Sequence, residues 1–267
     1  MTPNRLRWGA LAWLLTLQFF VVETITQVRV GGPYSRTDEL ISALGAADSP
    51  AHRLMNASFV VQGALILAGA LLLRPALRGA GARVAPVLLG AAAIGVLLVG
   101  VFPQDANLTL HRTGAVLYLA GSGLGLIALA YAVRRRSEAI GTVLAILGLV
   151  GTAMTVFFVA GVTEYLGKGG TERAAAYVVP LGLAAAGAAL WRMGAQAGPA
   201  EAVPAEAAGE RRSRRQEREQ TRARRAEQQR QRDEALEAAA RRRAGDEHDH
   251  PDENDDPWAT PRPRRGD

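Results

Sequence analysis

The chain has 267 residues, of which 49% are hydrophobic and 21% are charged, and its formal net charge is +6. Residues 1–194 carry 15 of the 31 basic residues and 8 of the 25 acidic residues, whereas residues 195–267 hold the other 16 and 17. This segregation excludes a single soluble globule, and the absence of cysteine excludes disulfides, thiolate metal sites and iron–sulfur clusters. We therefore predict a membrane domain over 1–194 and a cytoplasmic, low-complexity charged tail over 195–267.

Six apolar segments of the first domain are each long enough to cross a bilayer, because about 20 helical residues span a hydrocarbon core of about 30 Å. The first is 8–28, which contains Glu23 and Gln27 in its last third. Since the runs are continuously apolar, they do not fit the two-residue alternation of a membrane β-barrel. The predicted fold is all-α, a polytopic membrane protein with six transmembrane helices. The other five segments contain no charged residue and cover 54–73, 84–102, 113–133, 139–163 and 174–191.

The first segment resembles a secretory signal, because Arg5 and Arg7 precede it. No small-residue cleavage site follows the apolar run, and Glu23 and Arg29 stand there instead. We interpret this segment as a retained first helix.

Basic residues are unevenly distributed between the short loops. With the N-terminus inside, the inner segments hold nine arginines and one acidic residue, and the outer segments hold six basic and six acidic residues. Positively charged loops stay in the cytoplasm, so both termini are predicted to be cytoplasmic and the protein to lie in the inner or plasma membrane. Arginine-rich, Ala- and Gly-rich composition suggests a bacterial gene.

A weak internal repeat indicates three successive helix hairpins, unless it only reflects the preference of outer helix ends for polar residues. Each helix that returns inward begins near a polar residue followed by arginine. The three pairs are His52-Arg53, His111-Arg112 and Glu172-Arg173.

The longest outer loop, residues 29–53, contains a predicted short helix. A hydroxyl residue before Asp38 can cap a helix over 38–44 that stops at Gly45. On such a helix Asp38 and Ser42, four residues apart, would share one face.

Polar and ionisable residues gather at the predicted outer surface. Glu23 lies about one helical turn deeper, and a carboxylate within hydrocarbon must face the bundle interior and find a partner. Arg53 and Arg112 are the candidate partners. We therefore expect either a converging outer-face polar site or an interhelical hydrogen-bond network that fixes the loop. The candidate site residues are Glu23, Asp38, Ser42, His52, Arg53, Asn56, Asp105, His111, Arg112 and Glu164. No catalytic residue, metal ligand or cofactor is predicted.

The sixth segment contains Pro180, whose missing amide donor should free the carbonyl of Ala176 and kink the helix. Small residues recur in the patterns Gly121-x-x-x-Gly125 and Gly182-x-x-x-Ala186. Because small residues let helices approach closely in lipid, these patterns indicate packing within one bundle or a dimer face. The oligomeric state stays open.

The tail has an arginine-rich stretch followed by an acidic block. Arg211–Arg243 holds 13 arginines and 6 acidic residues, and it favours helix by propensity without a coiled-coil repeat. We interpret the tail as disordered or partly helical. Its arginine-rich stretch is expected to contact anionic lipid or a cytosolic protein. Nucleic-acid binding is not predicted, because no aromatic residues are interleaved with the arginines.

Three short motifs occur in the same order as in a known family. The string Tyr34–Gly45, the segment Ser49–Asn56 and the segment Gly100–Asp105, followed by His111, resemble the bacterial and archaeal membrane family called domain of unknown function 998. The resemblance covers roughly residues 8–194 and excludes the tail. It implies about six membrane helices and no established activity.

Three functions fit these features. The first is a non-catalytic, lipid-interacting or membrane-organising protein, so we expect no enzymatic activity. The second is a membrane-embedded metal-dependent hydrolase acting on lipid, because His52, His111 and nearby carboxylates could hold zinc. The two histidines lie on different loops, which disfavours it. The third is a small-solute transporter, for which Glu23 and Pro180 are the available intramembrane features.

Overall fold

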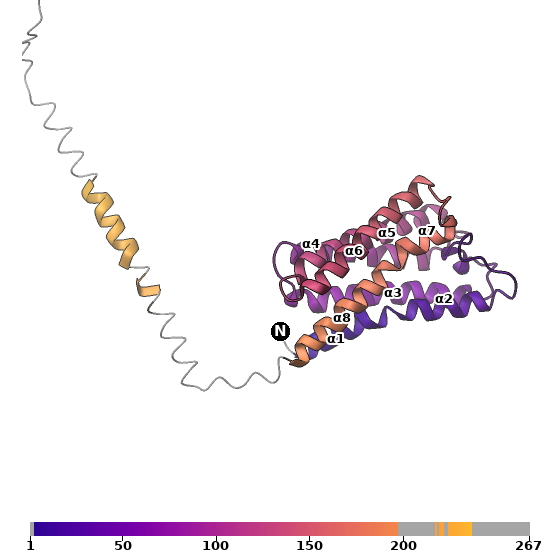
Figure 1. Ribbon diagram of the computed structural model, residues 1–267, viewed down its shortest axis with the longest axis horizontal. Helices are drawn as coiled ribbons and strands as arrows, with labels where there is room; N and C mark the ends of the chain where they lie inside the picture. Colours follow the sequence, from indigo (N-terminus) through magenta and orange to yellow (C-terminus); the bar gives the residue numbers. More distant parts are fainter. Residues whose placement is uncertain (1–2, 197–216, 218, 222–223, 237–267) are drawn as a thin grey trace, which may run out of the picture. The chain divides into compact units, whose positions relative to one another are not determined.

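The computed structural model describes residues 3–196, 217, 219–221 and 224–236. The chain divides into two units, residues 1–198 and 199–267 (Figure 1). In the second unit the described residues are helical and exposed, and they form part of the predicted arginine-rich stretch. The acidic block over 246–256 lies outside the described residues.

The first unit is built from helices, and no β-strand occurs among the described residues. Six candidate membrane spans confirm the predicted all-α, multi-pass fold. The α-helices are α1 (Pro3–Leu15), α2 (Gln18–Val28), α3 (His52–Leu73), α4 (Gly81–Val101), α5 (Leu108–Val133), α6 (Glu138–Ala160), α7 (Gly167–Ala176) and α8 (Val178–Gln196), and two short 3₁₀ helices are η1 (Ser42–Gly45) and η2 (Arg74–Ala76).

The helices run along one another as an antiparallel bundle (Figure 1). Helix α4 packs between α3 and α5, α5 also contacts α6, and α1 lies between α3 and α8. The start of α1, the end of α8 and the short connections 74–80 and 134–137 lie together at what we call the arginine end. The connections 29–51, 102–107 and 161–166 lie at the opposite end, the loop end.

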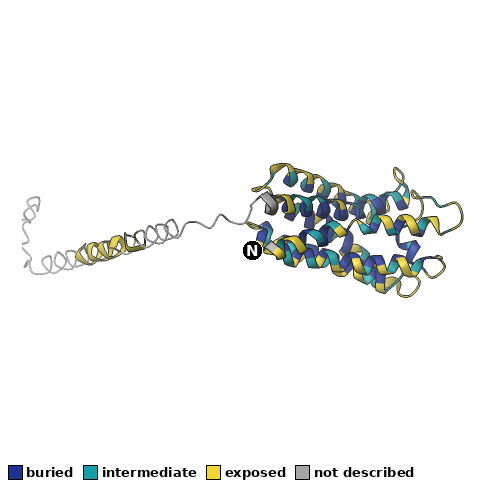
Figure 2. Cartoon of the chain, turned by 90° about the horizontal axis from the view of Figure 1, so that it is seen from below, coloured by how far each residue is buried: buried dark blue, intermediate teal, exposed yellow. Residues whose placement is uncertain are grey.

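The outward faces of the spans are apolar. Val21, Val87 and Leu149 are 60%, 71% and 61% exposed, whereas Trp13 and Leu126 are fully buried between the helices. Exposed and buried faces alternate around each helix, as Figure 2 shows. A soluble bundle would place charged side chains on its outer face. This distribution instead suits a bundle surrounded by lipid tails.

The first span is broken, whereas the sequence predicts one continuous helix. Helix α1 ends at Leu15, and at Thr16 and Leu17 the amides bond to carbonyls three residues back, as in a 3₁₀ turn. The Thr16 hydroxyl donates to the carbonyl of Trp13 and also lies 3.3 Å from the carbonyl of Pro180. The break in the first span therefore meets the last span.

The last span is also broken, at Tyr177 between α7 and α8, three residues before Pro180. Proline has no amide hydrogen, so the carbonyl of Ala176 lacks its helical donor. The hydroxyl of Tyr118, which is 5% exposed on α5, donates to that carbonyl at 3.2 Å. The predicted free carbonyl thus has a partner from another helix.

The small-residue patterns pack inside this bundle. A Cβ on Gly121 would lie 2.8 Å from the backbone of Ala92 on α4, and one on Gly182 would lie 2.7 Å from the Leu126 side chain on α5. These glycines therefore let neighbouring helices of one chain approach closely, which accounts for both patterns without a second copy.

The bond between Tyr118 and Ala176 yields a first prediction. Tyr118→Phe should lower the free energy of unfolding by about 1–2 kcal/mol, because the Ala176 carbonyl loses its donor in a buried site. In a Pro180→Ala background, where residue 180 regains an amide hydrogen, the same change should cost less. Denaturation in detergent, followed by circular dichroism, measures both costs. Tyr131→Phe, on the exposed face of α5, is the control. Equal costs in the two backgrounds would contradict this account.

Candidate functional site

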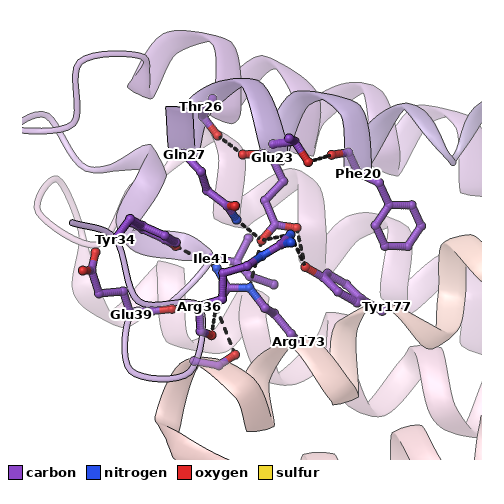
Figure 3. A network of polar contacts seen from close by, with 12 residues as sticks. Phe20, Glu23, Thr26, Gln27, Tyr34, Arg36, Glu39, Ile41, Arg173 and Tyr177 are labelled. Atoms are coloured by element: carbon purple, nitrogen blue, oxygen red, sulfur yellow. Dashed lines mark hydrogen bonds and ion pairs between the residues drawn. The ribbon is translucent and has the colours of Figure 1, made fainter. Parts of the chain in front are cut away.

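Glu23 is the centre of a polar network at the loop end of the bundle (Figure 3). It lies in the second half of α2, and its side chain is fully buried. One carboxylate oxygen, Oε1, accepts hydrogen bonds from Gln27 at 2.7 Å and from Arg173 at 2.9 Å. The other, Oε2, accepts from the hydroxyl of Tyr177 at 2.7 Å. Both oxygens of this carboxylate are therefore occupied.

Arg173 is the cation that compensates Glu23. It comes from α7 and is 6% exposed. Its Nε donates to Glu23, its Nη2 donates to the hydroxyl of Tyr34 at 2.7 Å, and its Nη1 lies within hydrogen-bond distance of three backbone carbonyls, those of Arg36, Glu39 and Gly169. A guanidinium suits this position because it carries five donors in a planar fork.

The network also holds an exposed cation at its edge. The guanidinium of Arg36 lies 3.7 Å from the Glu23 carboxylate and donates to the Tyr177 hydroxyl at 3.2 Å, and its side chain is 52% exposed. A pairing in which one partner is half-exposed contributes little to stability, because water screens it. The buried Glu23–Arg173 pair is the main electrostatic contact of the cluster.

Two buried charged residues of α7, Glu172 and Arg173, tie down the segment 34–41, which we call the strap. Arg173 holds the strap through the carbonyls of residues 36 and 39, and the buried carboxylate of Glu172 accepts the amide of Ile41. Burial raises the pKa of the Tyr34 hydroxyl, although the nearby Arg173 opposes this, so Tyr34 stays protonated and available as a polar partner.

Close backbone contact between strap and α7 requires glycine. Gly167 has a φ of +71°, and a Cβ there would lie 2.3 Å from the carbonyl oxygen of Thr37. A Cβ on Gly169 would lie 2.1 Å from the carbonyl oxygen of Glu39. The amide of Gly170 donates to the Thr37 carbonyl at 3.0 Å. The glycine-rich start of α7 is therefore the surface on which the strap lies.

A small cavity lies beneath the strap. Its volume is about 30 Å³, enough for one or two water molecules, and apolar side chains form most of its wall. Four polar side chains also line it: Ser42, His111, Tyr118 and Glu172. Nδ1 of His111 lies 3.0 Å from the carbonyl of Phe102, and since a carbonyl only accepts, this nitrogen carries the proton. The structure thus brings together the predicted residues Ser42 and His111.

Three other predicted residues hold the segment that leads into α3. Nδ1 of His52 bonds to the carbonyl of Ser49 at 2.8 Å, and the amide of Asn56 donates to the carbonyl of Gly45 at 2.9 Å. The Asp105 carboxylate accepts the amide of Ala47 at 2.9 Å. That bond lowers the pKa of Asp105, so its contribution to stability is lost only as the pH falls through this lowered value.

The predicted helix over 38–44 does not form as expected. A turn occupies 36–38, a bend follows at Glu39, and only Ser42–Gly45 is helical, as the 3₁₀ helix η1. Asp38 is exposed and accepts from the Ser35 hydroxyl, whereas Ser42 is buried, so the two do not share a face. The reason is that Arg173 and Glu172 engage strap carbonyls and an amide that a regular helix would have used internally.

The predicted partners of Glu23 were wrong. Arg53 and Arg112 are exposed, and neither forms an ion pair with Glu23, whose two cations are Arg173 and Arg36. Glu164 is also exposed, in the connection before α7. Asp38, Arg53, Arg112 and Glu164 belong to neither the network nor the cavity lining.

Sequence reasoning noticed Glu172 and Arg173 only as the third polar–arginine pair of a repeat. One signal could have separated this pair from the other two. Tyr177 follows Arg173 by four residues, and the glycines of the run Gly167–Gly170 precede the pair. The pairs His52-Arg53 and His111-Arg112 have no such flanking residues. Arg173 and Tyr177 therefore share a helix face that can meet a carboxylate.

A different kind of feature lies at the arginine end. A groove of about 330 Å³ runs between α5 and α6, with mostly apolar or small lining residues and with Arg134 and Glu138 at its polar end. Arg134 is exposed, and its guanidinium lies 5.9 Å from the ring centre of Tyr131. This groove opens on the face that lipid tails would cover.

The described residues contain no group of three or more His, Asp or Glu side chains placed to hold a metal ion. In that part of the chain His52 and His111 bond to separate backbone carbonyls. The arrangement at the loop end therefore gives no support to the hydrolase hypothesis.

The buried ion pair yields a second prediction. Arg173→Gln should lower the free energy of unfolding by about 3–5 kcal/mol, because the buried Glu23 carboxylate loses its buried counter-ion and keeps only the half-exposed Arg36 at 3.7 Å. The double variant Glu23→Gln/Arg173→Gln should cost less than the two single changes together. Arg173→Lys should keep only part of the stability that Arg173→Gln loses, since an ammonium has three donors and no planar fork. Unfolding in detergent measures all four proteins, with exposed Arg112→Gln as control. Strictly additive costs would show that the pair is not coupled.

The comparisons with known proteins agree with this architecture. The model of the family described as "Protein of unknown function (DUF998)" matches residues 14–189, which include the whole network, the cavity and the α5/α6 groove and leave out the charged tail. No curated protein and no solved structure shows a significant match. Since the family model covers well over half of the chain, the protein belongs to the DUF998 family of multi-pass membrane proteins of unknown function.

Proposed function

We propose that this protein is a non-catalytic membrane protein that binds phospholipid and organises its local membrane. The observation that carries the proposal is the groove between α5 and α6, an apolar channel on the lipid-facing surface. At its end lies Arg134, which is exposed and forms no ion pair within the described part of the chain. An acyl chain is the natural ligand of an apolar groove within hydrocarbon, and an arginine at the membrane surface attracts a phosphate.

The length of the groove supports a lipid occupant. On α6 its lining runs from Glu138 to Leu149. Eleven residues of helix rise about 16 Å, and half of the hydrocarbon core is about 15 Å. The groove thus extends from the membrane surface to the middle of the bilayer, the depth that one lipid leaflet occupies.

The loop end supports a structural role for the outer polar residues. Both Glu23 oxygens are occupied, and Asn56, Asp105 and His111 each bond to the backbone of a loop or helix end. Groups that are already paired in this way are poorly placed to transfer protons or bind metal. These contacts fit the interhelical network that fixes the loop.

Orientation is part of the proposal. Nine arginines lie at or near the arginine end, at residues 5, 7, 74, 78, 83, 134, 135, 136 and 192, with Glu138 as the acidic residue among them. We infer that this end faces the cytoplasm, because positively charged loops stay on the cytoplasmic side of a membrane. Both termini would then lie on the cytoplasmic side of the cell membrane. The arginine-rich stretch Arg211–Arg243 would then reach anionic lipid of the same leaflet or a cytosolic protein.

Lipid binding yields a third prediction. The full chain, purified in mild detergent, should retain phospholipid at about one molecule per protein or more after extensive washing, as measured by native mass spectrometry. Thr142→Trp, which fills the groove from an exposed position on α6, should release this lipid. Val143→Trp, its exposed neighbour outside the groove lining, should keep it. Folded wild-type protein free of lipid would overturn the proposed function.

A small-solute transporter is a second candidate, favoured by a specific observation. The breaks in the first and last spans meet through Thr16 and Pro180, and discontinuous helices of this kind often line substrate sites in transporters. In the bundle interior, the Gln62 amide nitrogen and the Ser122 hydroxyl are buried without a hydrogen-bond partner in the described part of the chain. Such atoms would be satisfied if a water-filled path opened through the bundle.

One labelling experiment separates the two candidates and tests orientation. Because the chain has no cysteine, Lys168→Cys, Arg136→Cys and Ser122→Cys each carry a single thiol. In intact cells a membrane-impermeant maleimide should label Lys168→Cys at the loop end and leave Arg136→Cys unlabelled. Ser122→Cys, which is fully buried, should stay unlabelled from either side. Labelling of Ser122→Cys would favour the transporter. Labelling of Arg136→Cys would show that the arginine end faces outward, opposite to the proposed orientation.

A further inference from the structure

The groove between α5 and α6 has a neighbour on the other side of Tyr131. A second groove lies between α4 and α5 and is lined by Ala80, Gly81, Val84 and Ala128, with Arg134 and Arg135 at its polar end. Tyr131 and Arg134 line both grooves. The Tyr131 ring, which is 62% exposed, therefore forms the ridge between two apolar channels that end at the same arginine.

We infer that the two grooves together form one binding site for an anionic phospholipid with two acyl chains. One chain lies in each groove, the Tyr131 ring separates them, and Arg134 and Arg135 bind the headgroup phosphate. This inference rests on the proposed lipid-binding function and specifies the class of lipid and its place on the bundle.

The concave shape of the site depends on small residues. Gly81 on α4 packs directly on α5, since a Cβ there would lie 2.4 Å from the carbonyl oxygen of Ala128. Gly141 on α6 packs against Arg134, since a Cβ there would lie 2.8 Å from the Arg134 Cβ. Both flanking helices therefore approach α5 closely beside Tyr131. Because the residues at these contacts are small, the tyrosine ring projects beyond the lining of both grooves.

Charge selects the headgroup. Residues 134–138 carry three arginines and one glutamate, all exposed, and none of the three arginines forms an ion pair in the described part of the chain. The Arg134 guanidinium lies over the Tyr131 ring, 5.9 Å from its centre, which places it at the junction of the grooves. A phosphate supplies the missing acceptor in a bidentate geometry that guanidinium groups favour. A second copy of this chain would bring like charges together, which disfavours that occupant.

The test uses the full chain reconstituted in phosphatidylcholine vesicles that contain a trace of spin-labelled phosphatidylglycerol or spin-labelled phosphatidylcholine. Electron paramagnetic resonance gives the fraction of each label that the protein immobilises. Both lipids carry a phosphate, but the choline cation of phosphatidylcholine cancels its charge and is repelled by the arginines. Phosphatidylglycerol, with a net negative charge, should therefore be preferred by roughly fivefold for each arginine at the headgroup. Arg134→Gln/Arg135→Gln should abolish most of this preference. Arg112→Gln, an exposed arginine at the opposite end of the same helix, should leave it unchanged.

Groove-filling variants keep the test independent of charge. Thr142→Trp should reduce the immobilised fraction of phosphatidylglycerol, whereas Val143→Trp should not. A preference for phosphatidylglycerol that survives Arg134→Gln/Arg135→Gln, or equal immobilisation of both lipids by the wild type, would overturn this inference and leave lipid binding itself intact. If the protein immobilised neither lipid, this result would instead contradict the proposed function, phospholipid binding. Disulfide cross-linking between copies that carry Thr142→Cys would show that the groove is an interface, which also overturns the inference.

Discussion

A carboxylate and a guanidinium buried between membrane-spanning helices cannot be solvated by water, so each must be satisfied by the protein. Glu23 and Arg173 meet this constraint together, one from the first span and one from the last. Their pairing joins segments 150 residues apart and needs a geometry that few arrangements allow. The remaining donors of Arg173 then fix the strap, and the strap covers the small, mostly apolar cavity. Much of the loop end therefore depends on this single contact.

The break in the last span lies at the same contact. Tyr177, between α7 and α8, donates its hydroxyl to Glu23, and the first span breaks at Thr16, seven residues before Glu23. The polar groups at these breaks are satisfied locally: the Thr16 hydroxyl donates to the carbonyl of Trp13, and Tyr118 donates to the carbonyl that Pro180 leaves free. Irregular backbone is tolerated within a membrane only where protein supplies such partners.

The two ends of the bundle differ in what they leave unpaired. At the loop end, most of the buried polar side chains bond to one another or to backbone groups. At the arginine end, Arg134 and Arg135 face outward beside apolar grooves and have no acidic partner in the described structure. Unpaired charge next to an apolar channel at the membrane surface is the combination that a phospholipid complements. For this reason we assign ligand binding to the arginine end and a structural role to the network around Glu23.

The sequence by itself determined the number of spans, the helical fold and the family, because long apolar runs and local motifs depend only on neighbouring residues. It also indicated that Glu23 needs a partner, since burying a lone carboxylate is costly wherever it occurs. Only the tertiary structure decided that the partner is Arg173, that two spans are broken and that Tyr131 stands between two grooves. Those features arise from contacts between segments far apart in the chain, and hydrophobic periodicity carries no information about which distant side chains meet.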